Sequence, residues 1–120
     1  MTELDWTLED DRKTVTITFP TTPLELDAAA LEALLEKLGE FRAHMLPEVP
    51  EAFPEGRSFP SVADPAWKTD PDFLHGFVFL DIRDPRFGWL RYILSRDSAG
   101  KLARSLQKDM EITPWVPGVG

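Results

Sequence analysis

Cysteine is absent from this 120-residue chain, and so is any long run of apolar residues. Without cysteine there is no disulfide, no thiolate metal site and no cysteine nucleophile. The longest stretch of large apolar residues is 77–80, whereas a membrane helix needs about 20. The first residues, MTELDWTLEDD, have neither the basic nor the apolar part of a signal peptide. We therefore expect a cytoplasmic protein without a membrane segment.

Motifs of catalysis are also missing. No serine stands in a GxSxG or SxxK context, and the glycines are too dispersed to form a phosphate-binding loop. The two histidines, His44 and His75, have no second histidine at the spacing of metal ligands. The sequence therefore predicts no catalytic residue, no metal site and no cofactor, which favours a protein that is not an enzyme.

The net charge of −8 is concentrated in the first half of the chain. Residues 1–55 carry 13 acidic and 4 basic side chains, whereas residues 56–120 carry 8 and 9. An acidic surface repels phosphate backbones, so nucleic-acid binding is disfavoured. One alternative is anion or nucleic-acid binding by the basic stretch, which needs its side chains to share one face. That stretch comprises Arg83, Arg86, Arg91, Arg96, Lys101, Arg104 and Lys108, against Asp84 and Asp97.

The pattern of the first 46 residues predicts a β-hairpin followed by a helix. Apolar and polar residues alternate on both sides of an acidic turn at 9–12, which is typical of half-buried strands. The helix begins after Asp27 as N-cap, or alternatively after Thr22, and Pro47 ends it. The apolar strand positions are Leu4, Trp6, Leu8, Val15, Ile17 and Phe19; those of the helix are Leu31, Leu34, Leu35, Leu38, Phe41 and Met45.

Residues 73–111 repeat that order. Two strands with apolar side chains on both faces flank the turn DPRFG, in which Pro85 and Gly88 supply the turn geometry. Ser95 then caps a second helix. The predicted inward face of this helix is Ala99, Leu102, Ala103, Leu106 and Met110.

Between these units, the segment 44–71 contains six of the eleven prolines. It also contains large apolar side chains, among them Phe53, Phe59 and Trp67, which a flexible linker lacks. We interpret it as a strap that lies across the sheet face opposite the helices. Long loops without secondary structure are often functional, so the strap is also a candidate lid or binding surface.

Together these patterns predict a single α+β domain over residues 1–120. Its order is ββαββα, with a first ββα unit at 1–46, the proline-rich strap at 47–72, a second ββα unit at 73–111 and an irregular tail at 112–120. We expect one antiparallel four-stranded sheet with two helices on one face. The apolar side chains are then used to build a closed core.

Our leading functional hypothesis is a non-enzymatic module that binds a partner protein or itself, with a homodimer paired through sheet edges as one form. An acidic chain also suits an inhibitor or chaperone of a basic partner. The candidate interaction surface is Phe53, Phe59, Trp67, Arg86, Phe87 and Trp89.

A second hypothesis is a small-ligand or hydrolytic site beneath the strap, built on His75, Asp72 and Asp81, with Asp70 nearby. Asp81 interrupts an apolar strand, and its favoured interpretation is a cross-strand ion pair with Arg91 or an outward position at the strand end.

Overall fold

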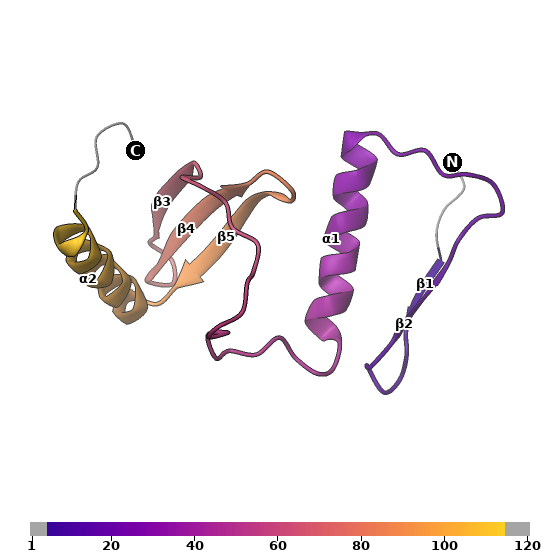
Figure 1. Ribbon diagram of the computed structural model, residues 1–120, viewed down its shortest axis with the longest axis horizontal. Helices are drawn as coiled ribbons and strands as arrows, with labels where there is room; N and C mark the ends of the chain where they lie inside the picture. Colours follow the sequence, from indigo (N-terminus) through magenta and orange to yellow (C-terminus); the bar gives the residue numbers. More distant parts are fainter. Residues whose placement is uncertain (1–4, 115–120) are drawn as a thin grey trace. The chain divides into compact units, whose positions relative to one another are not determined.

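The computed structural model describes residues 5–114 and has an α+β fold. The chain divides into two compact units, Met1–Phe59 and Pro60–Gly120. This boundary falls within the predicted strap, and a single domain over the whole chain stays a prediction. The elements are β1 (Asp5–Leu8), β2 (Val15–Thr18), α1 (Ala28–His44), β3 (Trp67–Asp72), β4 (Phe77–Asp84), β5 (Gly88–Leu94) and α2 (Arg96–Ile112) (Figure 1).

The first unit begins with the predicted hairpin. Strands β1 and β2 pair antiparallel, with Trp6 opposite Ile17. The turn between them places Arg12 at a φ of 62°. Leu4 lies outside the described residues, and Phe19 is 68% exposed rather than packed inward.

Helix α1 starts where the capping pattern predicts. The carboxylate of Asp27 accepts a hydrogen bond from the backbone N–H of Ala30 at 2.9 Å, which makes Asp27 the N-cap and excludes Thr22. The helix ends at His44, before Pro47.

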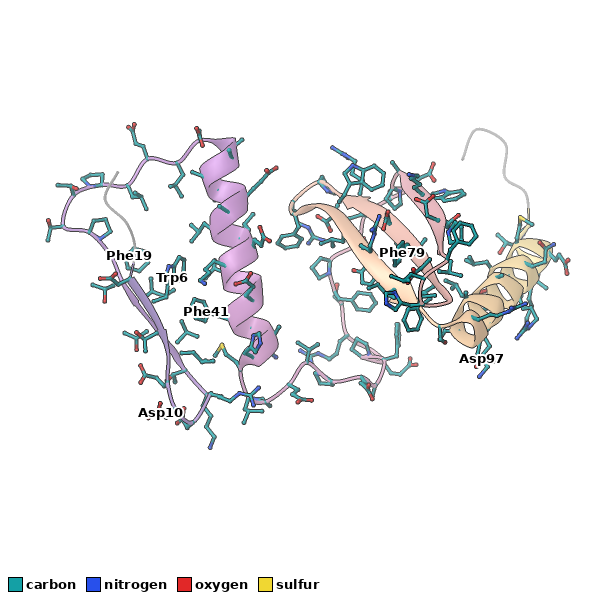
Figure 2. All side chains as sticks on the ribbon, turned by 180° about the vertical axis from the view of Figure 1, so that it is seen from behind. Trp6, Asp10, Phe19, Phe41, Phe79 and Asp97 are labelled. Atoms are coloured by element: carbon teal, nitrogen blue, oxygen red, sulfur yellow. The ribbon has the colours of Figure 1, made fainter. Side chains whose placement is uncertain are left out.

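Two contacts join α1 to the hairpin. Nε of Arg12 donates to the carbonyl oxygen of His44 at 2.6 Å, which satisfies one of the free carbonyl groups at the end of α1. The rings of Trp6 and Phe41 lie 5.6 Å apart, and Figure 2 shows both between the hairpin and the helix. The predicted apolar face of β1 and the predicted apolar face of α1 therefore contact each other through these two aromatic rings.

The second unit is a three-stranded antiparallel sheet in the order β3-β4-β5, followed by α2. Gly88 has a φ of 80° where the second hairpin returns, as the turn pattern predicts. The hydroxyl of Ser95 accepts a hydrogen bond from the N–H of Ser98 at 3.1 Å, which confirms Ser95 as the N-cap of α2. Helix α2 lies along one side of this sheet (Figure 1).

The predicted single sheet of four strands is not confirmed. The described residues form five strands in two sheets, one of two strands and one of three, and the additional strand, β3, is the end of the predicted strap. Its Pro71 obscured the strand signal, since proline lacks the N–H that a central strand needs. Proline is nevertheless tolerated on an edge strand, and β3 is one.

The rest of the strap, residues 47–66, has no helix or strand. Phe53 and Phe59 contact each other edge to face, with ring centroids 5.5 Å apart. Both remain more than half exposed, at 65% and 53%. The predicted cover over the sheet is not confirmed, and Asp64 and Pro65 instead lie on the same sheet face as α2.

The expectation of a closed core also needs correction. No hydrophobic side chain is buried among the residues described, and the one buried polar residue is Asp81, at 9% exposure. In the second unit the physical reason is a gap between α2 and the sheet, which leaves apolar side chains on both walls in contact with solvent. The predicted tail at 112–120 is helical at Ile112, and its residues 115–120, including Trp115, lie outside the described part.

Candidate functional site

An apolar groove separates α2 from the three-stranded sheet. Its volume is about 640 Å³, and every residue that lines it belongs to the second unit. The sheet wall follows from strand alternation, because residues at every second position share one face. The lining consists of Asp64, Pro65, Trp67, Thr69, Val78, Leu80, Ile82, Leu94, Ala99, Leu102, Ala103 and Leu106.

The helix wall of the groove was predicted as core. Ala99, Leu102, Ala103 and Leu106 repeat with helical spacing, and all four line the groove. The predicted fifth member, Met110, is 65% exposed and does not line it. The sequence pattern therefore identified the apolar face of α2 but not the space left beside it.

The groove has little capacity for acid–base chemistry. Asp64 is the one titratable side chain in its lining, and Thr69 is the one hydroxyl. Asp64 lies at the surface in a turn, with a φ of 42°. All other lining groups are aliphatic or aromatic, so the groove is suited to burying an apolar group rather than to activating a bond.

The opposite face of the sheet carries an ion pair. Nε and Nη2 of Arg91 donate to the two carboxylate oxygens of Asp81, both at 2.9 Å. The same guanidinium lies 4.4 Å from the ring centre of Phe79, which Figure 2 labels on the sheet. The side-chain hydrogen bonds from Arg91 lower the pKa of Asp81 and hold it ionised. The expected cross-strand pair is therefore present.

His75, in the β3–β4 turn, lies beside Asp72, the last residue of β3. His75 Nδ1 is 3.1 Å from Oδ2 of Asp72, and the backbone N–H groups of Leu74 and His75 donate to Oδ1. Partial burial raises the pKa of Asp72, but these hydrogen bonds outweigh it and lower the pKa overall. The His75 side chain is 61% exposed.

The second predicted site is not assembled by this geometry. Asp81 bonds to Arg91 on the strands, whereas Asp72 and His75 bond to each other in the turn. None of these three residues lines the groove. Within the described range, no group of three or more histidine and acidic side chains is arranged to hold a metal ion.

The second hairpin turn is organised by Asp84. Its carboxylate accepts hydrogen bonds from the backbone and the guanidinium of Arg86, and from the N–H of Phe87. The side-chain hydrogen bond from Arg86 is the largest influence, and together the bonds lower the pKa of Asp84 to about 2. Phe87 is 48% exposed at the turn.

The basic stretch is divided between the sheet, the second hairpin turn and helix α2. Arg83 and Arg91 project from the sheet face opposite the groove, Arg91 is bound to Asp81, and Arg86 is bound to Asp84. Arg104 stands on the side of α2 away from its apolar face, by helical spacing. Lys101, Arg104 and Lys108 do share one side of α2 by helical spacing, so anion binding through part of this stretch stays a prediction.

The predicted interaction residues also separate. Trp67 lines the groove and is 68% exposed, whereas Trp89 is on β5 with its side chain on the other sheet face. Phe53 and Phe59 belong to the first unit. Sequence reasoning missed Leu94 and Leu106 as groove-lining residues, because an apolar periodic position gives the same signal whether it is covered or bare.

Comparisons of the chain with protein-family models, with curated proteins and with solved structures found no match. Of the helices in the described residues, none is both long and apolar enough to cross a membrane.

Proposed function

We propose that the chain is a non-enzymatic, cytoplasmic interaction module, and that its second unit binds an apolar segment of a partner protein that carries basic flanking residues. The observation that carries the proposal is the open apolar groove between α2 and the sheet. The alternative partner, a second copy of the chain, is better served by an edge of the sheet than by the groove.

The size and lining of the groove support a peptide side-chain ligand. Binding pockets commonly enclose about 300–1,000 Å³, and the groove volume of about 640 Å³ falls within that range. Each large apolar side chain that leaves water contributes roughly 1.5–3 kcal/mol of transfer free energy. An amphipathic partner helix, with anchors on one face, is a recurring way to fill such a groove.

Charge favours a basic partner. The one charged side chain in the groove lining is the carboxylate of Asp64. The net charge of −8 belongs to the whole chain and is concentrated in its first half, whereas residues 60–120 carry 8 acidic and 8 basic side chains. An acidic protein attracts basic partners through its long-range field and repels acidic ones. Lysine or arginine beside the apolar anchors therefore complements the carboxylate of Asp64 at the groove.

The proline-rich segment gives the proposal a second element. Asp64 and Pro65, near its end, form part of the groove lining. We propose that the part of this segment in the second unit, residues 60–66, acts as a wall or lid of the binding surface. The rigid φ of proline lowers the entropy lost when such a segment is ordered by a ligand.

A designed peptide tests the proposal. The probe is an amphipathic helix of about 14 residues, with leucine on one face and lysine on the other, labelled for fluorescence anisotropy. A second probe has glutamate in place of every lysine. We expect the lysine probe to bind and to shift the NMR signals of groove residues such as Leu80 and Leu102, and the glutamate probe to bind at least about tenfold more weakly.

Adjacent positions on α2 provide a matched pair of variants. Leu106→Glu places a charge in the groove, whereas Ser105→Glu adds the same charge on a face of α2 that does not line it. We expect L106E to weaken binding of the lysine probe roughly tenfold or more, and S105E to leave it within about twofold. Equal effects of the two variants, or no binding by the wild type, would contradict the proposal. Leu106 is 62% exposed, so L106E is compatible with the fold.

A further inference from the structure

The three-stranded sheet has two edges, and they differ in chemistry. The strand order β3-β4-β5 places β3 and β5 at the edges of this sheet within the described residues. An edge strand presents unpaired backbone N–H and C=O groups that pair readily with another strand. Natural proteins protect such edges with proline and with charged side chains.

The hydrogen-bond pattern shows which groups face outward. The N–H of Arg83 donates to the carbonyl oxygen of Ala66 at 2.9 Å, so Arg83 bonds toward the β3 side of β4. Backbone groups alternate in direction along an antiparallel strand, so Ile82 bonds toward β5 and its opposite residue Leu90 bonds back to β4. By the same alternation, the backbone groups of Trp89, Arg91 and Ile93 point out from the edge of β5.

The edge formed by β3 is protected. Pro71 occupies an outward-facing position by the same alternation and has no N–H to offer. Lys68 and Asp70, on the same strand, form an ion pair of 3.0 Å. Strand β5 has no proline, and its one charged side chain is Arg91. The open edge of the sheet is therefore β5.

The sequence of β5, GWLRYIL, has an apolar pattern that is symmetric about Arg91. Trp89 and Ile93 are two positions away on either side, and Leu90 and Tyr92 are one position away. In an antiparallel pair of two identical strands centred on Arg91, tryptophan lies opposite isoleucine and leucine opposite tyrosine, twice each. Aromatic–aliphatic pairs of this kind stabilise sheets. Trp89, Tyr92 and Ile93 are 57%, 49% and 61% exposed, so each has surface left to bury.

The charge at the centre is already compensated. Two Arg91 side chains opposite each other across a two-fold axis would repel if they were free, but each is held by Asp81 of its own sheet in a bidentate ion pair. When the two β5 strands approach each other, each Arg91 is therefore already neutralised by the Asp81 of its own copy, and repulsion between the two arginines is reduced.

We propose that β5 pairs antiparallel with β5 of a second copy, with Arg91 at the two-fold axis, so that two three-stranded sheets join into one continuous sheet. This surface is the edge of the sheet and not the groove, so the proposal is independent of the partner-binding function above. The interface is isologous, as in most symmetric dimers.

The absence of cysteine makes cross-linking a direct test of the pairing and its register. In the proposed register Trp89 lies opposite Ile93 of the second copy at a hydrogen-bonded pair, about 5.5 Å between Cα atoms, which permits a disulfide. A mixture of Trp89→Cys and Ile93→Cys chains is expected to cross-link under mild oxidation. Either variant alone is expected to stay uncross-linked, because like positions are roughly 13 Å apart. Trp67→Cys, on the β3 edge, is the matched control. Mixed with W89C or with I93C, it is expected to stay uncross-linked.

A proline variant tests the edge without a cross-link. Ile93→Pro removes an N–H that points outward, so the hydrogen bonds between β4 and β5 are kept while pairing with a second copy is blocked. By sedimentation equilibrium we expect two chains for the wild type and one for I93P, with unchanged circular dichroism. A single chain for the wild type at every concentration, or cross-linking by W89C alone, would overturn the proposal. Leu106→Glu is expected to leave the dimer intact, which separates this interface from the groove.

Discussion

Arg91 lies directly opposite Asp81 in the β4–β5 register, and their side chains form two parallel hydrogen bonds of 2.9 Å. The guanidinium also lies over the ring of Phe79, so one side chain connects a carboxylate and an aromatic ring of the central strand. Asp81 is the one buried residue in the described part of the chain. In a sheet without a closed core, this pair adds a side-chain link to the backbone pairing of β4 and β5.

Loss of this ion pair is expected to destabilise the second unit. Asp81→Asn keeps the shape but removes the charge, and Arg91→Lys keeps the charge but loses the planar fork that makes both hydrogen bonds. Each should lower the thermal midpoint by a few degrees, and the double variant should lower it by less than the sum. Asp70→Asn is the control, because the Lys68–Asp70 pair is exposed and such pairs contribute little. Equal midpoints for D81N and D70N would contradict the prediction.

Stability at acid pH is expected to depend on Asp84. Its pKa of about 2, set mainly by the side-chain hydrogen bond from Arg86, is below the ordinary value of 3.8. A lowered pKa in the folded state stabilises the fold above pH ~4, and this contribution is lost as pH falls through 2. Urea denaturation at pH 5, 3 and 2 should therefore show a falling midpoint. In Asp84→Asn the fall should be smaller, and an identical profile for wild type and D84N would show that the turn contributes nothing.

The elements whose signals are local could be predicted from the sequence. Asp27 and Ser95 accept hydrogen bonds from backbone N–H groups three residues on, so each cap is defined by its own turn of chain. The Asp81–Arg91 pair follows from counting positions across one short turn. Such features need no knowledge of the rest of the fold.

The features that depend on tertiary packing could not be predicted in the same way. Pro71 argued against a strand, yet it lies in β3 because the edge position leaves its missing N–H unneeded. Leu102 and Leu106 carry the same helical signal in a filled core as in a groove, so the groove was interpreted as core. Whether apolar faces meet depends on distances between elements, which periodicity does not contain.

Substitutions at two glycines, Gly88 and Gly39, distinguish the effect of backbone strain from the effect of steric crowding. An added Cβ at Gly88 or at Gly39 would meet no atom within 4 Å, but Gly88 has a φ of 80° whereas Gly39 lies within helix α1. Gly88→Ala should therefore cost about 1 kcal/mol or more, because left-handed backbone is unfavourable for residues with a Cβ. Gly39→Ala should instead stabilise by up to about 1 kcal/mol through helix propensity. Chemical denaturation measures both, and a loss of stability in G39A would show that α1 needs the glycine for another reason.

Trypsin is expected to cut the chain at Arg57 faster than at Lys68. Arg57 lies in the segment 47–66, which has no helix or strand, whereas Lys68 is paired within β3 opposite Asp81. A protease needs an unpaired, accessible stretch of chain, and sheet hydrogen bonds must open before Lys68 is available.

Mass spectrometry at early times should show a fragment that begins at Ser58 and resists further cleavage at Lys68. In Arg57→Gln this fragment should disappear without faster cutting at Lys68. Early cleavage at Lys68 in either protein would mean that β3 opens more easily than its hydrogen-bonded register implies. The groove wall formed by β3 would then be mobile.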